Sequence, residues 1–155
     1  MVQGTVESHP LKSESFDLVC FWDVLEHVVD PKEKLRQVKS LLKPNGMVLV
    51  NYPDIGTIQA KLAGKRFWWI LSVHLHHFSR STICRTAELT GYELVRFKPY
   101  WQKLEFGYLE KVAVHLKVPL ARFLEKLTPG FIQRIPFPYY ASQTTALLRP
   151  IPDKG

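Results

Sequence analysis

Three side chains suited to proton transfer follow one apolar run of the sequence. Residues 16–22 are almost continuously apolar, and Asp23, Glu26 and His27 come just after them. The run predicts a buried parallel strand, and ligands in open α/β sheets bind beyond the carboxyl ends of such strands. His27 is therefore a candidate catalytic base, with Glu26 or Asp23 nearby. The alternative is that Glu26 and His27 only begin a helix.

A second group is the histidine-rich segment formed by His74, His76 and His77. The spacing cannot place all three side chains on one face of a strand and provides no obvious fourth ligand, so we predict no metal site. We expect His74 and His77 to line an acceptor pocket with Tyr52 and with Trp68 or the tryptophan after it. Aromatic walls suit a planar or lipid-like substrate. Simple core packing explains these residues equally well.

The elements that must position these residues begin with a helix and a second strand. Asp30 is a predicted N-cap, Pro31 takes the first helical position, and apolar residues at helical spacing end near Lys43. Residues 44–46 predict a turn and residues 47–50 a short strand. The order strand, helix, strand predicts a right-handed parallel crossover.

The middle of the chain predicts one more helix and one more strand. Residues 55–73 form an aromatic-rich excursion. Ser79 or Ser81 can cap a helix over residues 82–90 that closes at a glycine, and residues 92–97 then predict a strand.

The last third of the chain predicts a helical insertion before a final strand. Residues 104–127 indicate two short amphipathic helices interrupted by Pro119. A proline-rich link at residues 135–138 leads to a predicted strand at residues 144–148, and Pro150 begins a tail. We expect the basic segment 104–134 to be a lid over the acceptor pocket, a helical pair packed on its own domain, or a peripheral contact with an anionic membrane.

Composition and charge narrow the class of protein. With 155 residues and 46% apolar composition, the chain predicts one globular domain. No apolar run approaches a membrane span and no signal-peptide pattern is present, which favours the cytoplasm.

The basic residues are unevenly distributed. Residues 61–155 hold 15 of the 21 basic residues but only 6 of the 14 acidic ones. We expect no nucleic-acid partner, since no base-reading or stacking motif accompanies this charge. Cys20 and Cys84 have no metal-type spacing, and we expect no disulfide.

Several motifs in a fixed order resemble the second half of the class I S-adenosylmethionine-dependent methyltransferases. Residues 16–27, FDLVCFWDVLEH, resemble the fourth strand and its turn, and residues 42–46, LKPNG, resemble the end of the next helix. Residues 4–7 look like the turn after the third strand. Residues 74–79 and 87–92 are similar to a stretch in the small-molecule branch of that family.

The resemblance implies a fold, a cofactor and further site residues. The fold is a partial Rossmann-like methyltransferase sheet of α/β class in one domain over residues 1–155, mostly parallel with an antiparallel final strand and with helices on both faces. The cofactor is S-adenosylmethionine and the acceptor is a small molecule. By the family pattern, Thr5, Val6 and Glu7 would edge the adenine, whereas Trp22 and Asp23 would lie near the sulfonium and amino end.

The family's glycine-rich cofactor loop has no counterpart in this sequence. Its first strand, that loop and the acidic end of its second strand would precede Met1, and no G-x-G occurs. We therefore expect a truncated domain, or a homo-oligomer in which another chain covers the exposed edge of residues 16–22. The alternative function is a non-catalytic methyltransferase-like module that binds a partner through this edge and its basic half.

Overall fold

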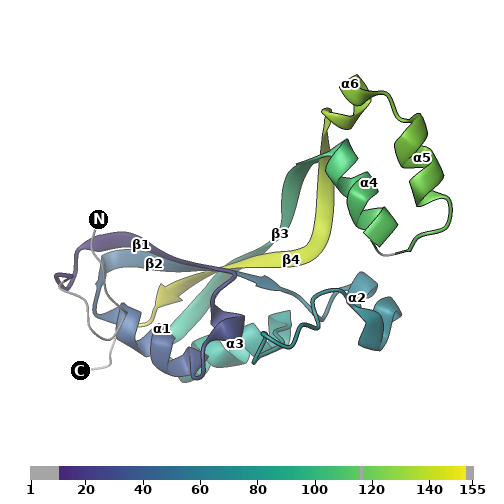
Figure 1. The fold of residues 1–155 in the computed structure, drawn as a ribbon. Coiled ribbons are helices and arrows are strands. Elements are labelled where there is room, and N and C mark those ends of the chain that lie inside the picture. Colours follow the sequence, from purple (N-terminus) through teal and green to yellow (C-terminus); the bar gives the residue numbers. More distant parts are fainter. Residues whose placement is uncertain (1–10, 116, 153–155) are drawn as a thin grey trace. The chain divides into compact units, whose positions relative to one another are not determined.

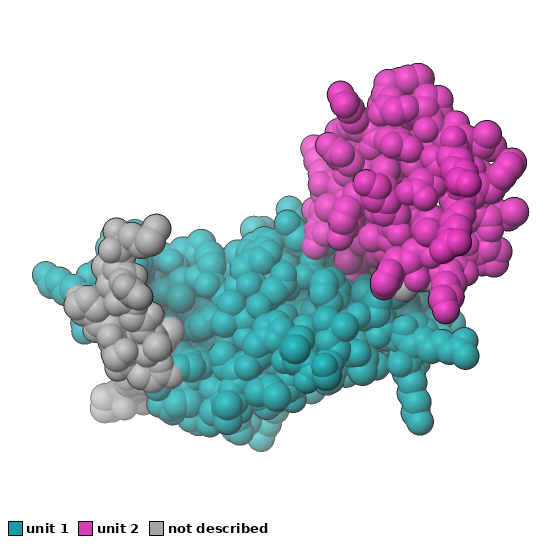
Figure 2. All heavy atoms as spheres, in the orientation of Figure 1, with its two compact units in different colours: residues 1–100, 142–155 teal, residues 101–141 magenta. Residues whose placement is uncertain are grey.

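The computed structural model describes residues 11–115 and 117–152, which form two compact units. Unit 1 comprises residues 1–100 and 142–155, and unit 2 comprises residues 101–141 (Figure 2). The basic segment 104–134 therefore lies within a compact unit of its own. In the part of the chain that the structure describes, no helix has the length and apolar character needed to cross a bilayer.

A four-stranded sheet forms the centre of unit 1 (Figure 1). In sequence order the described strands are β1 (Phe16–Trp22), β2 (Leu42–Pro53), β3 (Tyr92–Glu105) and β4 (Pro136–Pro150). Their order across the sheet is β1-β2-β4-β3, with β1 parallel to β2 and β4 antiparallel to β2. The α/β class and the antiparallel final strand are confirmed. The sheet is less parallel than expected, because β4 lies between β2 and β3 and runs antiparallel to β2.

Helices join the strands and make up most of unit 2. The α-helices are α1 (Pro31–Lys39), α2 (Ile58–Ala63), α3 (Arg80–Leu89), α4 (Phe106–His115), α5 (Ala121–Leu127) and α6 (Gly130–Gln133). Two 3₁₀ turns are η1 (Leu25–His27) and η2 (Gly64–Arg66). The predicted caps are confirmed: Asp30 accepts hydrogen bonds from the first turn of α1, and Ser79 rather than Ser81 caps α3.

The core of unit 1 lies between one face of the sheet and helices α1 and α3, which pack side by side (Figure 1). Its buried members include Val48, Val50, Leu35, Val38, Ile83 and Ala87. The other face of β1 exposes Leu18 (47%) and Trp22 (43%). The prediction that residues 16–22 are buried on both faces is therefore wrong. As an edge strand of the described sheet, β1 has one strand neighbour, β2, and helices cover only one of its faces.

The strands are longer than predicted, since β2, β3 and β4 were expected over residues 47–50, 92–97 and 144–148. Strand β2 begins at Leu42, which pairs with Phe16, so helix α1 ends before the predicted Lys43. The predicted turn at residues 44–46 is a shift of register inside β2. A Cβ atom on Gly46 would lie 2.7 Å from the Phe16 carbonyl oxygen, which explains why glycine occupies this position.

Unit 2 contains the two predicted amphipathic helices, α4 and α5, and the short helix α6. The break between α4 and α5 falls at Pro119 and at Leu120, which adopts a left-handed backbone with φ 63°. Gly107 lets α4 approach α6 closely, since a Cβ there would lie 2.8 Å from the Cβ of Gln133. The predicted link at residues 135–138 belongs instead to strand β4 from Pro136, and proline is tolerated at the first position of a strand.

Candidate functional site

The carboxyl end of β1 turns sharply at Asp23. Its backbone adopts a left-handed φ of 51°, and its amide donates to the Asn51 carbonyl oxygen at 3.2 Å. The Asp23 carboxylate accepts a hydrogen bond of 2.7 Å from Gln143 Nε2 on β4. Burial raises the pKa of Asp23, and the bond from Gln143 and the charges of nearby histidines oppose that shift. A strained, half-buried carboxylate is typical of a functional site.

Glu26 lies in the 3₁₀ turn that follows, and its side chain is enclosed. The residue is 1% exposed, and neither carboxylate oxygen has a hydrogen-bond partner among the described residues. Burial raises the pKa of this carboxyl group. The Glu26 carbonyl oxygen accepts backbone hydrogen bonds from Leu75 at 2.8 Å and His76 at 3.1 Å. These two bonds hold the histidine-rich segment against the turn after β1.

His27 and His74 face each other next to these carboxylates, with ring centroids 4.7 Å apart. The Nδ1 atom of His27 lies 3.0 Å from the Val73 carbonyl oxygen, and that of His74 lies 2.8 Å from the Trp69 carbonyl oxygen. A carbonyl oxygen only accepts, so each Nδ1 carries a hydrogen, and in the neutral ring Nε2 then has the lone pair. Burial lowers the pKa of His74, which favours its neutral form.

The structure brings some of the predicted site residues together. Asp23, His27 and His74 lie close enough to influence one another electrostatically, and the His77 ring lies 6.3 Å from that of His74. Trp22 ends β1 with a half-exposed ring that meets Tyr100 edge to face at 4.8 Å.

The remaining predicted residues are Tyr52, Trp68 and the three residues proposed for the adenine. Tyr52 is fully buried on β2 and its ring packs against Phe78 at 6.0 Å, within the core cluster of unit 1. Trp68 packs against Phe67 at 4.9 Å. The proposed adenine-edging residues, Thr5, Val6 and Glu7, lie outside the described residues.

Two polar residues at this end of the sheet were not among the site residues predicted from the sequence. Gln143 reaches Asp23 from 120 positions away, and nothing in its local sequence indicates that contact. Asn51 is fully buried opposite Trp22 in the parallel pair, and its side-chain amide has no partner among the described residues. Its position at the carboxyl end of a predicted strand was a usable signal, because ligands bind there.

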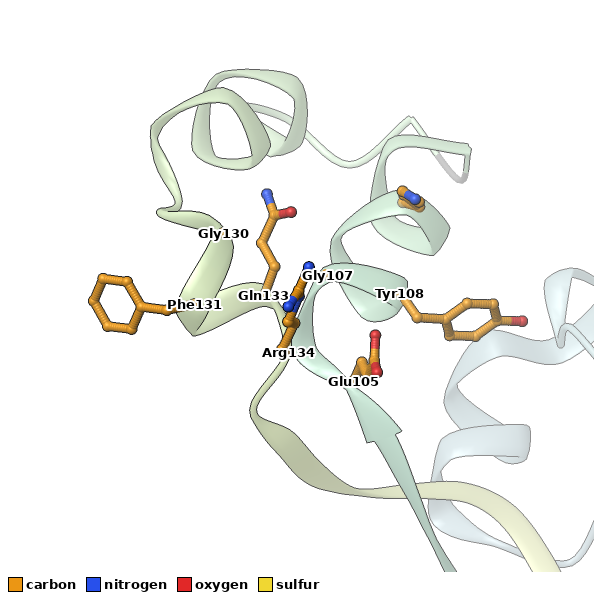
Figure 3. Close-up of a pocket in the computed structure, with 8 residues that line it drawn as sticks. Glu105, Gly107, Tyr108, Gly130, Phe131, Gln133 and Arg134 are labelled. Carbon is orange, nitrogen blue, oxygen red and sulfur yellow. The ribbon is translucent and has the colours of Figure 1, made fainter.

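A pocket of about 720 Å³ belongs to unit 2. In Figure 3, Glu105 and Arg134 lie beside Gly107, whereas Tyr108 and Phe131 point away to opposite sides. None of its lining residues belongs to the cluster around Asp23. A smaller pocket of about 190 Å³ in unit 1 includes His77 in its wall. Convergent polar groups, rather than pocket size, make the end of β1 the candidate site.

Comparisons with known proteins identify the family and the fold of this chain. Residues 3–96 match a family model described as a methyltransferase domain. A Thermotoga maritima structure described as an S-adenosylmethionine-dependent methyltransferase is 21% identical with a TM-score of 0.56, and the match covers 94% of this chain and 61% of that one. A protein assigned as a methyltransferase was solved with the Haloferax volcanii Trm112 methyltransferase activator. It is 12% identical with a TM-score of 0.59, and the match covers 96% of this chain and 60% of that one.

A Bacillus halodurans protein assigned as a methyltransferase is 16% identical with a TM-score of 0.55, covering 97% of this chain and 76% of that one. At these identities the likeness establishes the fold. The chain spans about three fifths of the length of the first two structures. No curated protein matched it in a sequence comparison.

Proposed function

We propose a function from one premise: this chain belongs to the methyltransferase domain family, whose model matches more than half of it. Its resemblance to the class I S-adenosylmethionine-dependent enzymes is thereby confirmed. The proposed function is transfer of the methyl group of S-adenosylmethionine to a small-molecule acceptor. The observation that carries it is the half-buried Asp23 carboxylate, held by Gln143 at the carboxyl end of β1.

The cofactor would meet this chain at Trp22 and Asp23. Both residues lie where open α/β sheets bind ligands, and the buried Asn51 on the neighbouring strand adds an amide to the same edge. The Asp23 carboxylate suits the amino group of the cofactor, and the Trp22 ring suits its sulfonium, because an aromatic face attracts a cation. Thr5, Val6 and Glu7 remain the proposed contacts of the adenine.

The reaction is an in-line displacement on the methyl carbon. The bond from that carbon to sulfur breaks, a bond to the acceptor atom forms, and S-adenosylhomocysteine leaves with the electron pair on sulfur. An acceptor hydroxyl or amine must also lose a proton. His27 can take that proton at Nε2, because its Nδ1 hydrogen is engaged by the Val73 carbonyl oxygen. His74, His77, Tyr52 and Trp68 remain the proposed pocket residues for the acceptor.

Calorimetric titration with S-adenosylhomocysteine tests the cofactor assignment. The titration is made on this chain and on the complete coding sequence that contains it, and binding to at least the latter is expected. Asp23→Ala should weaken that binding at least tenfold, since a buried charge-assisted contact is lost. The matched control is Asp17→Ala on the same strand, whose exposed carboxylate pairs with Lys43. Absence of binding in both proteins, or equal effects of the two substitutions, contradicts the assignment.

A second candidate function is a methyltransferase-like binding module without catalysis. The exposed apolar side chains of the edge strand β1, Leu18 and Trp22, favour it. A second copy covering this edge would make the chain a dimer, which light scattering after gel filtration measures. Leu18→Lys should then give a folded monomer. A dimer that binds no S-adenosylhomocysteine supports this candidate, and a monomer that binds it contradicts the candidate.

A further inference from the structure

Glu26, His27 and His74 form a cluster that the methyl-transfer proposal does not fully use. Each offers a potential metal ligand atom, and these three atoms lie within 4.8 Å of one another. Ligands about 2.1 Å from a tetrahedral metal lie about 3.4 Å apart, so binding would draw the side chains together by roughly 1 to 1.5 Å. This set differs from the histidine-rich segment considered in the sequence, because two of its members come from the turn after β1.

The two imidazoles are already oriented as metal ligands usually are. Histidines that bind metals commonly donate their second ring hydrogen to a backbone carbonyl or a carboxylate, which fixes the tautomer. His27 and His74 both do this, through Nδ1 to the carbonyl oxygens of Val73 and Trp69. Their Nε2 lone pairs therefore remain available for a cation.

The buried side chain of Glu26 independently indicates that a cation binds next to its carboxylate. Its side chain is almost wholly buried, and both carboxylate oxygens are unpartnered among the described residues. Burying a carboxylate without a partner is costly unless it is protonated or meets a cation. No Lys or Arg among the described residues forms an ion pair with Glu26. Burial and the charge of Asp23 raise the pKa of Glu26, whereas its own backbone amide and the His27 ring partly oppose that shift.

We propose that Glu26, His27 and His74 bind one divalent transition-metal ion at the carboxyl end of β1. Two imidazoles and one carboxylate suit Zn²⁺, Fe²⁺, Co²⁺ or Mn²⁺ better than Mg²⁺ or Ca²⁺, which prefer oxygen ligands throughout. Three protein ligands leave a coordination position open, as in catalytic rather than structural sites.

A metal ion at this site would replace the role of His27 as the base, and this step alone rests on the proposed function. An acceptor oxygen bound at the open position would become more acidic, because a divalent cation stabilises its deprotonated form. His27 would then act as a ligand that holds the ion, and the acceptor proton would pass to solvent.

Metal titration of the untagged chain tests the proposal directly. The protein is stripped with a chelator and titrated with Zn²⁺ by calorimetry, and with Co²⁺, whose visible absorption reports nitrogen and oxygen ligands. We expect one equivalent of each metal and a Zn²⁺-dependent rise in the thermal midpoint. Glu26→Gln, His27→Ala and His74→Ala should each weaken Zn²⁺ binding at least tenfold.

His76→Ala is the matched control, because this histidine lies in the same segment but outside the cluster, with Nε2 bonded to the Val29 carbonyl oxygen. It should bind Zn²⁺ as the unchanged chain does. Glu26→Gln keeps the shape of the side chain, and circular dichroism confirms that the variant is folded. Failure of the unchanged chain to bind Zn²⁺, or equal binding by Glu26→Gln and His76→Ala, overturns the proposal. The titration contains no S-adenosylmethionine, so its outcome is separate from that of the cofactor experiment.

Discussion

Replacement of Asp54 by alanine should destabilise unit 1 strongly, because this carboxylate joins three segments at the end of β2. The Asp54 side chain is 1% exposed. One oxygen accepts a hydrogen bond of 2.8 Å from the Gly56 amide, and the other accepts one of 2.9 Å from Thr144 Oγ1 on β4. The guanidinium of Arg80, the first residue of α3, lies 3.6 Å from the second oxygen.

The expected loss follows from these contacts. Hydrogen bonds to a charged group contribute about 1.5 to 3 kcal/mol each, and removing one partner leaves the other group buried and unsatisfied. Two such bonds and a partly exposed ion pair predict a loss of about 3 to 5 kcal/mol in the free energy of unfolding. With a urea dependence of about 1 to 3 kcal/mol per molar, the unfolding midpoint should fall by more than about 1 M.

Asp17→Ala provides the comparison for this measurement. Asp17 also contacts a cation closely, with Lys43 Nζ at 2.8 and 2.9 Å, but its side chain is 84% exposed. Exposed pairs of this kind contribute little, so the urea midpoint should not change measurably. Both variants are unfolded in urea and followed by tryptophan fluorescence and circular dichroism. Similar midpoints for the two variants would refute the argument that burial makes the Asp54 contacts more stabilising than the exposed Asp17 pair.

Three smaller perturbations follow from the same structure. Tyr92→Phe removes a buried hydroxyl that donates to the Leu35 carbonyl oxygen at 2.8 Å, and urea unfolding should show a loss of about 1 to 3 kcal/mol. Ser79→Ala removes the cap of α3, and the same assay should show a loss of about 1 kcal/mol. Hydrogen bonding from the Glu33 amide lowers the pKa of Asp30. Ionised Asp30 therefore stabilises the fold above its unfolded pKa of about 3.9, and this stabilisation is lost as pH falls through the lower folded pKa. Asp30→Asn should flatten that acid-side loss in thermal melts between about pH 5 and pH 2.

Local signals in the sequence were sufficient for most elements of the fold. The apolar run of β1, the cap at Asp30 and the cap at Ser79 depend on neighbouring residues only, and each was found in the structure at the predicted place. The two amphipathic helices on either side of Pro119 were also recognisable, since helical periodicity is a local property.

Element ends and exposure depend on distant residues and were less predictable. Strand β2 starts early because Leu42 finds a partner in Phe16, and a single sequence does not reveal such pairing. The prediction that β1 is buried on both faces relied on its apolar composition. Burial depends on what covers the strand, and in the described structure Leu18 and Trp22 are half exposed.

In the candidate site, too, residues marked by their local sequence were predicted, whereas contacts between distant segments were not. Asp23, Glu26 and His27 could be identified because they follow a strand, but the sequence did not show that Glu26 is buried. The histidine-rich segment contacts this turn, since the Leu75 amide donates a hydrogen bond to the Glu26 carbonyl oxygen and the His74 ring faces the His27 ring. A substitution that loosens this segment should therefore expose Glu26 and separate the two imidazoles together.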